Sequence, residues 1–152
     1  MPSTKPLRSK VYGYVLVVLA TLGLVDAALL TREHYSGVVL PCSVTKGCET
    51  VLSSKYSEVL GVPLALIGLF FYFSVLLAAL YFVQSGIAWV RKLLLAMGAV
   101  GFVSSLGLVY LQGVVIKAWC QYCLLSALSS TLIFVFAALL YTTKKEKHHE
   151  EA

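Results

Sequence analysis

The last apolar run of the chain, CQYCLLSALSSTLIFVFAALLY at residues 120–141, decides the fold. It carries no formal charge over about 22 residues, and about 20 apolar residues in a helix are enough to cross the hydrocarbon core of a membrane. Three other runs of similar length precede it, at about residues 11–30, 63–83 and 93–111. The sequence therefore predicts an all-α integral membrane protein, a bundle of four transmembrane helices forming a single membrane domain over residues 1–152.

The composition points the same way. Hydrophobic residues make up 59% of the chain and charged residues only 12%, whereas a soluble chain carries about 25% charged residues. A soluble domain of this size has too much surface to cover with so few charges, and the apolar content is too high for a disordered chain. The net charge of +5 does not indicate a nucleic-acid partner, because the basic residues form short clusters between apolar runs. We expect a lipid bilayer as partner and no nucleic acid.

The basic clusters predict the orientation of the chain. Most of the Lys and Arg residues flank alternate ends of the spans, namely Lys5, Arg8, Lys10, Arg91, Lys92, Lys144, Lys145 and Lys147. Cytoplasmic segments of membrane proteins carry an excess of basic residues. We therefore expect a multi-pass protein of the inner or plasma membrane, with cytoplasmic tails at residues 1–10 and 142–152. The extracytosolic side then holds a long loop, about residues 31–62, and a short one, about residues 112–119.

The long outer loop contains a pattern of its own. Residues 49–60 read ETVLSSKYSEVL, with apolar residues at both ends and polar residues between them. This pattern predicts a short amphipathic helix at the membrane surface. The following residues, Gly61 to Pro63, would end that helix and begin the second span, since proline is well tolerated in the first turn of a helix.

All four cysteines fall on the extracytosolic side in this topology. Cys42 and Cys48 lie in the long loop, and Cys120 and Cys123 form a CxxC motif at the start of the fourth span. The free N–H groups and the positive dipole end of a helix start favour a thiolate, which is the form that attacks disulfides and electron acceptors. We expect these N–H groups to support a Cys123 thiolate, placed to meet a lipid-soluble acceptor at the edge of the apolar phase. Cys120 is shallower and can be reached from the loop.

Four cysteines are also compatible with roles that involve no redox chemistry. They allow three pairings as structural disulfides, which would fit a non-enzymatic membrane scaffold. Four thiolates can also bind one zinc ion, although an oxidising compartment favours disulfides instead, and incidental buried cysteines are a further interpretation. A CxxC motif at a spanning helix start, with a second pair on the same side, favours thiol–disulfide redox chemistry.

The combined pattern resembles the bacterial members of the vitamin K epoxide reductase family over about residues 11–141. The matching features are Cys42-x5-Cys48, Val51, Ser54, Tyr56, Gly61-Val62-Pro63, Gly68, Tyr72 and Cys120-x-x-Cys123. DsbB-type quinone reductases also have four spans and two cysteine pairs, but they carry the CxxC motif in the first outer loop. Many bacterial members of the family continue into a thioredoxin-like domain. This chain ends shortly after the fourth span, so the resemblance is to a stand-alone member whose partner acts in trans.

The resemblance implies a role for each cysteine. Cys42 would take electrons from an extracytosolic thioredoxin-fold partner of DsbA type through a mixed disulfide. Cys48 would exchange with Cys120, and Cys123 would deliver the electrons to a membrane quinone such as menaquinone or ubiquinone, without a metal. The implied enzyme is a quinone-dependent thiol–disulfide oxidoreductase that drives disulfide formation in exported proteins. The alternative enzyme is a vitamin K epoxide or quinone reductase that generates quinol.

Four further residues are candidates for the site. Ser54 matches a Ser or Thr of the family motif, and its hydroxyl can donate a hydrogen bond to a quinone oxygen or a thiolate; a simple surface serine fits equally well. Trp119 and Tyr122 are candidates for quinone contact, although an aromatic belt at the membrane boundary also explains them. Asp26, the only formal charge inside the four runs, is a candidate proton carrier or an acid that reaches water near the end of the first span.

Overall fold

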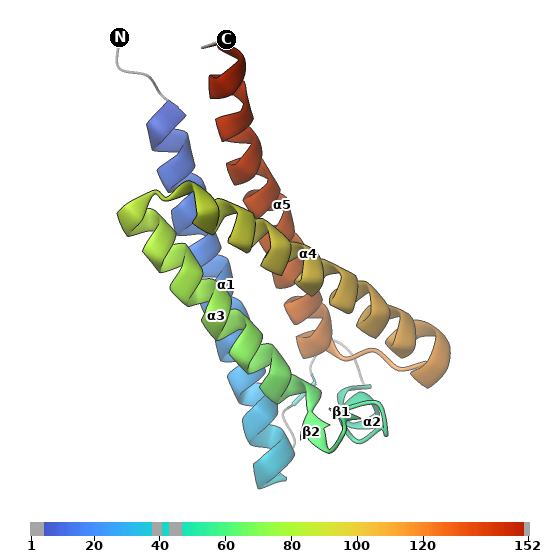
Figure 1. Ribbon diagram of the computed structural model, residues 1–152. Coiled ribbons are helices and arrows are strands. Elements are labelled where there is room, and N and C mark those ends of the chain that lie inside the picture. Colours follow the sequence, from blue (N-terminus) through green and yellow to red (C-terminus); the bar gives the residue numbers. More distant parts are fainter. Residues whose placement is uncertain (1–4, 38–40, 43–46, 151–152) are drawn as a thin grey trace.

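The computed structural model describes residues 5–37, 41–42 and 47–150. Within them, four helices are long and apolar enough to cross a membrane (Figure 1). They are α1 (Lys5–Ser36), α3 (Leu64–Ser85), α4 (Ala88–Tyr110) and α5 (Gln121–Glu150). The prediction of an all-α bundle of four membrane-spanning helices is confirmed. Residues 1–4 and 151–152, which belong to the predicted tails, lie outside the described residues.

The helices form a bundle in which α1 packs against α3 and α5, and α4 packs against α5 and α3. The beginning of α1 and the end of α5 lie at one end of the bundle (Figure 1). The short helix α2 (Cys48–Leu52), the small hairpin and the beginning of α5 lie at the opposite end. The long loop and the CxxC motif, far apart in the sequence, therefore meet at the same end.

Three of the predicted spans continue well beyond their expected ends as helix. The first extends to Ser36, the fourth extends to Glu150, and the third passes from α4 into a π-helix, η1 (Leu111–Ile116). A left-handed conformation at Lys117, with φ 56°, ends η1. The predicted short loop at 112–119 is therefore mostly helical, and only a few residues separate η1 from α5.

The prediction of a helix over residues 49–60 is wrong beyond Leu52. The hydroxyl of Ser53 donates to the carbonyl of Glu49 at 2.6 Å, and the hydroxyl of Ser54 donates to the carbonyl of Val51 at 2.7 Å. Serine hydroxyls that bind nearby carbonyls in this way compete with the helical hydrogen bonds. The helix ends there, after a single short stretch.

An antiparallel hairpin follows, with β1 (Glu58–Val59) paired to β2 (Val62–Pro63). Both residues of its tip have positive φ, 54° at Leu60 and 79° at Gly61. Two-residue hairpins favour turns of this kind because their twist matches that of the strands. The hairpin leads directly into α3, whose N-cap is Pro63.

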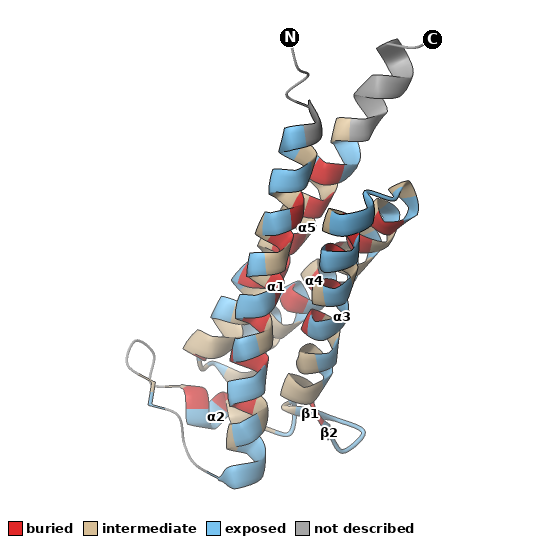
Figure 2. Ribbon diagram, turned by 90° about the vertical axis from the view of Figure 1, so that its left-hand side faces the viewer, coloured by how far each residue is buried: buried red, intermediate tan, exposed pale blue. Residues whose placement is uncertain are grey.

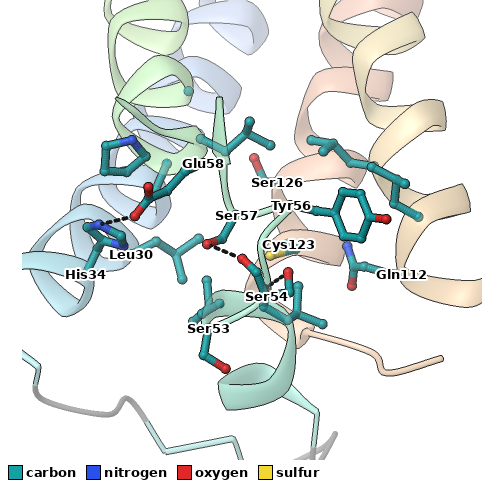
Figure 3. Close-up of a pocket in the computed structure, with 18 of the residues that line it drawn as sticks. Leu30, His34, Ser53, Ser54, Tyr56, Ser57, Glu58, Gln112, Cys123 and Ser126 are labelled. Carbon is teal, nitrogen blue, oxygen red and sulfur yellow. Dashed lines mark hydrogen bonds and ion pairs between the residues drawn. The ribbon is translucent and has the colours of Figure 1, made fainter. Parts of the chain in front are cut away.

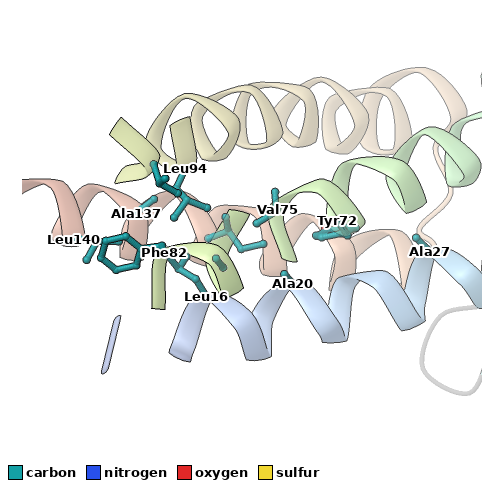
Figure 4. Close-up of a cluster of buried hydrophobic side chains, with 12 residues drawn as sticks. Leu16, Ala20, Ala27, Tyr72, Val75, Phe82, Leu94, Ala137 and Leu140 are labelled. Carbon is teal, nitrogen blue, oxygen red and sulfur yellow. The ribbon is translucent and has the colours of Figure 1, made fainter. Parts of the chain in front are cut away.

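The inner faces of α1, α3, α4 and α5 form one apolar core (Figure 4). Leu16, Val75 and Leu94 are fully buried in it. The outer faces carry large exposed apolar side chains, such as Phe70 at 64% and Val103 at 66% exposure (Figure 2). Such surfaces are unfavourable in water over this length and suit the hydrocarbon core of a bilayer.

Candidate functional site

The four cysteines meet at one end of the bundle. Cys42 and Cys48 form a disulfide with Cα atoms 6.2 Å apart, while Cys120 and Cys123 are thiols. Cys48 and Cys120 are 2% and 0% exposed and belong to the same buried cluster, together with Val51 of α2. The loop disulfide thus packs against the CxxC motif, as a relay between the two pairs requires.

Gly47 makes this packing possible. A Cβ atom at Gly47 would lie 2.7 Å from the backbone nitrogen of Trp119 and 2.8 Å from its carbonyl oxygen. Only a residue without a side chain lets the loop backbone approach the residues just before α5 so closely. The hydroxyl of Tyr122 adds a second tie, donating to the carbonyl of Pro41 at 3.2 Å. Both contacts hold the loop disulfide over the start of α5.

Cys120 occupies the position just before the first turn of α5. The backbone N–H of Cys123 donates to Cys120 Sγ at 3.4 Å, and the N–H of Leu124 donates to the Cys120 carbonyl at 3.0 Å. The prediction that the free N–H groups of this helix start support Cys123 is therefore wrong. They are directed at Cys120, because the side chain before the first turn is the one that reaches them.

Hydrogen bonds to the Cys120 sulfur favour its thiolate form. The Cys123 thiol, together with the backbone N–H groups of Cys123 and Tyr122, lowers the pKa of Cys120 below its ordinary value, against the opposing effect of burial. Cys120 precedes the apolar stretch Gln121–Thr143 of α5. The residue that touches the loop disulfide cluster is thus also the one whose thiolate is supported.

Gln112 holds Cys120 from the other side. Its side-chain Oε1 accepts the backbone N–H of Cys120 at 3.0 Å, and its carbonyl accepts the N–H of Ala118 at 3.1 Å. Gln112 lies in the π-helix η1 and is 3% exposed. π-Helical turns often occur at functional sites. Sequence reasoning missed this residue, although a lone amide in the apolar stretch LVYLQGVVI (residues 108–116) was a usable signal.

A cavity of about 590 Å³ opens beside the CxxC motif (Figure 3). Its volume falls within the range of small-molecule sites, about 300–1,000 Å³. Residues of all four long helices, of α2, of η1 and of the hairpin line it, and Cys123 is the cysteine in its wall. Apolar residues line much of it, including Leu30, Leu108 and Ile116. A mostly apolar molecule of medium size fits such a space.

A polar contact lies on the loop side of the cavity. His34 Nε2 of α1 and Glu58 Oε1 of β1 are 3.3 Å apart, and both residues line the cavity (Figure 3). Their side chains are 29% and 45% exposed. This contact joins the end of α1 to the hairpin, so the polar edge of the cavity is braced by two segments distant in sequence.

The structure places Ser54 in the cavity wall. Its hydroxyl hydrogen is used within the loop, since it donates to the carbonyl of Val51 at 2.7 Å, and Ser57 in turn donates to the Ser54 carbonyl at 2.8 Å. Ser54 thus presents acceptor lone pairs to the cavity in this conformation.

The structure does not bring Trp119 and Tyr122 to the cavity. The Trp119 ring lies against η1, where a Cβ atom at Gly113 would come within 3.0 Å of it, and it is 45% exposed. Tyr122 binds the loop through Pro41. Both aromatic residues pack the segment around the CxxC motif, and neither is among the residues that line the cavity.

Asp26 lies inside the bundle and not near the end of its helix. Helix α1 continues to Ser36. Asp26 is 5% exposed, and its Oδ2 has no hydrogen-bond partner among the described residues. The expectation that Asp26 reaches water at the end of the first span is wrong. In the described part of the chain, no group of three or more His, Cys, Asp or Glu side chains is placed to hold a metal ion.

The family of the chain follows from these features and from one comparison. The family model described as the vitamin K epoxide reductase family matches residues 14–138, which include all four cysteines, the hairpin and the residues around the cavity. The matched residues thus hold most of the four membrane-spanning helices and both cysteine pairs. The chain belongs to the vitamin K epoxide reductase family and is a membrane oxidoreductase.

Proposed function

We propose that the protein transfers electrons from the dithiol of an extracytosolic thioredoxin-fold protein to a membrane quinone, and so drives disulfide formation in exported proteins. The observation that carries this proposal is the position of Cys123. Its side chain lies in the wall of a mostly apolar cavity of about 590 Å³, while its partner Cys120 packs against the loop disulfide. One cysteine pair therefore faces a lipid-soluble acceptor on one side and a second pair on the other.

The chemistry balances over three exchanges. Oxidation of the Cys120 and Cys123 thiols to a disulfide releases two electrons and two protons, which convert the quinone to quinol. The thiolate of Cys48 then attacks Cys120, and the second attack, by Cys42 on Cys48, leaves a Cys42–Cys48 disulfide and two thiols at the CxxC motif. The dithiol of the partner protein reduces that loop disulfide and leaves with a disulfide of its own.

The residues around the sulfurs support these steps. A hydrogen bond from the Cys123 N–H to Cys120 Sγ at 3.4 Å favours the Cys120 thiolate as the leaving group of the exchange with Cys48. Cys42 is the more exposed member of the loop pair, and Cys48 is 2% exposed. A folded partner can reach Cys42 first, and the electrons then pass inward through Cys48.

The orientation of the chain is part of the proposal. The beginning of α1 and the end of α5 lie at the end of the bundle opposite the cysteines, and basic residues flank the α1 and α5 ends in the sequence. By the excess of basic residues on cytoplasmic segments, we place both termini in the cytoplasm and the cysteines on the extracytosolic side of the inner or plasma membrane.

Reconstitution with a reduced thioredoxin-fold protein and decylubiquinone tests the function. We expect quinone absorbance to fall as the partner becomes oxidised, in equal molar amounts. A partner that keeps only its attacking cysteine should stay bound to Cys42 as a mixed disulfide, with Cys48 released as a thiol. A protein that only carried structural disulfides would leave both the quinone and the partner unchanged. A vitamin K epoxide reductase would instead consume the epoxide at a rate higher than the quinone.

A further inference from the structure

Gln112 is placed to touch both the redox pair and whatever fills the cavity. The side chain is 3% exposed and lines the cavity that Cys123 also lines. Its Oε1 accepts the N–H of Cys120 at 3.0 Å. Because a backbone N–H can only donate, the atom that faces Cys120 must be the oxygen, and the amide nitrogen must take the other position.

The Nε2 group is a donor with no partner of its own. Among the residues that the structure describes, none accepts a hydrogen bond from it. Figure 3 shows the nitrogen of Gln112 directed toward the side of the cavity where the Tyr56 ring lies, with the oxygen pointing away from it. Because Gln112 lines the cavity, a ligand oxygen there could accept a hydrogen bond from this amide.

The serine hydroxyls that line the cavity are already engaged. Ser53, Ser54 and Ser57 donate to the backbone carbonyls of Glu49, Val51 and Ser54. Farther in, the Ser105 hydroxyl pairs with Ser130 at 2.5 Å, and the Ser126 hydroxyl pairs with Tyr72 at 2.8 Å. Unlike these hydroxyls, the Gln112 amide donates no hydrogen bond to another described residue, so its hydrogens stay available to a molecule in the cavity.

We propose that Gln112 binds a carbonyl oxygen of the quinone through Nε2 while its Oε1 holds Cys120. The inference rests on the proposed function and assigns this chain a quinone-contacting residue beyond its cysteines. When the Cys120 and Cys123 thiols become a disulfide, the two electrons raise the negative charge on the quinone oxygens until both protons arrive. A donor fixed beside one of those oxygens stabilises that charge. Gln112 supplies no proton or electron itself.

The same side chain also positions the reaction. Gln112 binds the backbone N–H of Cys120 through Oε1 and the quinone through Nε2. One amide group therefore determines where the quinone lies relative to the cysteine pair. Its other anchors are rigid, since its carbonyl binds Ala118 and the chain turns sharply at Lys117, with φ 56°. Displacing the amide would therefore disturb substrate and thiols together, and removing only the donor would disturb the substrate alone.

The test separates these two contacts in the full-length protein. Gln112→Glu keeps an oxygen that can accept the Cys120 N–H and removes the amide donor, whereas Gln112→Met removes both and adds no charge. Gln84→Glu is the control, because Gln84 lies on α3 at the far end of the bundle. Dithiothreitol is the electron donor and decylubiquinone is the acceptor. Two rates are measured. The first is the reduction of decylubiquinone, and the second is the reduction of the Cys120–Cys123 disulfide by dithiothreitol, which rapid alkylation of the new thiols reports.

We expect Gln112→Glu to lose about 10²-fold in kcat/KM for decylubiquinone, the usual effect of removing one such donor, while its rate of disulfide reduction stays near that of the wild type. Gln112→Met should slow both steps, and Gln84→Glu neither. The ratio of Gln112→Glu to wild-type activity should improve as the pH falls, because a protonated carboxyl regains one O–H donor.

Unchanged KM and kcat for decylubiquinone in Gln112→Glu overturn the proposal, and so does an equal loss of both rates, which would mean that Gln112 only supports the fold. If Gln112→Glu does not fold, an unchanged KM in Gln112→Met overturns it as well. A wild-type protein that exchanges disulfides but never reduces decylubiquinone refutes the proposed function itself, and this inference with it.

Discussion

The two thiols of the CxxC motif differ in surroundings: the Cys123 backbone N–H donates to Cys120 Sγ at 3.4 Å, while the Cys123 side chain lines the cavity. Cys120 is fully buried against the loop disulfide cluster. The sulfur that packs beside the loop disulfide and the sulfur in the cavity wall are therefore different atoms, held one helical turn apart. This division is the basis of the first two predictions.

The first prediction concerns the protonation of Cys120. In a protein with Cys42→Ser and Cys48→Ser, Cys123→Ala should raise the pKa of Cys120 relative to Cys123→Ser, because alanine removes the side-chain donor that most lowers this pKa. The thiolate then appears only at higher pH. Ultraviolet absorbance of the thiolate, titrated against pH, measures the midpoint of this single thiol. Equal midpoints in the two variants would show that the side-chain hydrogen bond is not formed.

The second prediction concerns the order of the pairs. Replacing Cys120 or Cys123 by alanine should reduce quinone turnover to background with any electron donor. Replacing Cys42 or Cys48 should block a folded protein donor but spare dithiothreitol, since this small dithiol can enter through the cavity that exposes Cys123. Steady-state reduction of decylubiquinone with each donor decides it. Equal loss with dithiothreitol in all four variants would mean that the loop pair is more than a relay.

The third prediction is that Cys42 and Cys123, the more exposed member of each pair, label from the extracytosolic side. All four cysteines lie at one end of the bundle, opposite the beginning of α1 and the end of α5. Single-cysteine variants in intact cells, treated with a reducing agent and an impermeant maleimide, measure the side. Labelling of either of them only after the inner face is opened would reverse the orientation.

Much of this arrangement could be predicted from the sequence, because it depends on long apolar runs and on the side of the membrane that each loop occupies. The four spans follow from those runs, and the topology places all four cysteines on one side, whereas the pairing of Cys48 with Cys120 was implied by the family resemblance. The end of α2 could not be predicted in this way, since Ser53 and Ser54 decide it by binding carbonyls one turn back. An apolar and polar pattern does not reveal that competition.

The details of the site depend on side-chain directions that periodicity does not give. Trp119 and Tyr122 lie near the start of α5 as expected, but their rings pack on η1 and on the loop and do not line the cavity. The free N–H groups of α5 reach Cys120 and not Cys123. The exact first residue of the helix decides which side chain they reach, and an apolar run gives that residue only approximately. The lone amide of Gln112 in an apolar stretch was a signal in the sequence, but the π-helical turn that directs it toward Cys120 was not.

The fourth prediction concerns Tyr72, whose hydroxyl binds the carbonyl of Ser126 at 2.7 Å and its side chain at 2.8 Å. Tyr72 is 2% exposed, so Tyr72→Phe leaves polar atoms of α5 without this partner. We expect a loss of about 1 kcal/mol in unfolding free energy, typical of a hydrogen bond between membrane helices. Denaturation in mixed detergent micelles measures it. Tyr81→Phe on the exposed face of the same helix should leave the unfolding free energy unchanged. A similar loss in Tyr81→Phe would show that the hydrogen bonds of Tyr72 are not the cause.

The fifth prediction concerns the close approach of α4 and α5. A Cβ atom at Gly98 would lie 2.9 Å from the Cα of Phe134 and 3.3 Å from its nitrogen, and a backbone cannot move aside as a side chain can. Gly98→Ala should therefore cost about 1–3 kcal/mol through overpacking, beyond the small gain in helix propensity. Gly107→Ala on the same helix meets no atom within 4 Å, so it should be neutral or stabilising by up to about 1 kcal/mol. Unfolding in mixed micelles compares the two, and equal stability would mean that the helices are not held together at Gly98.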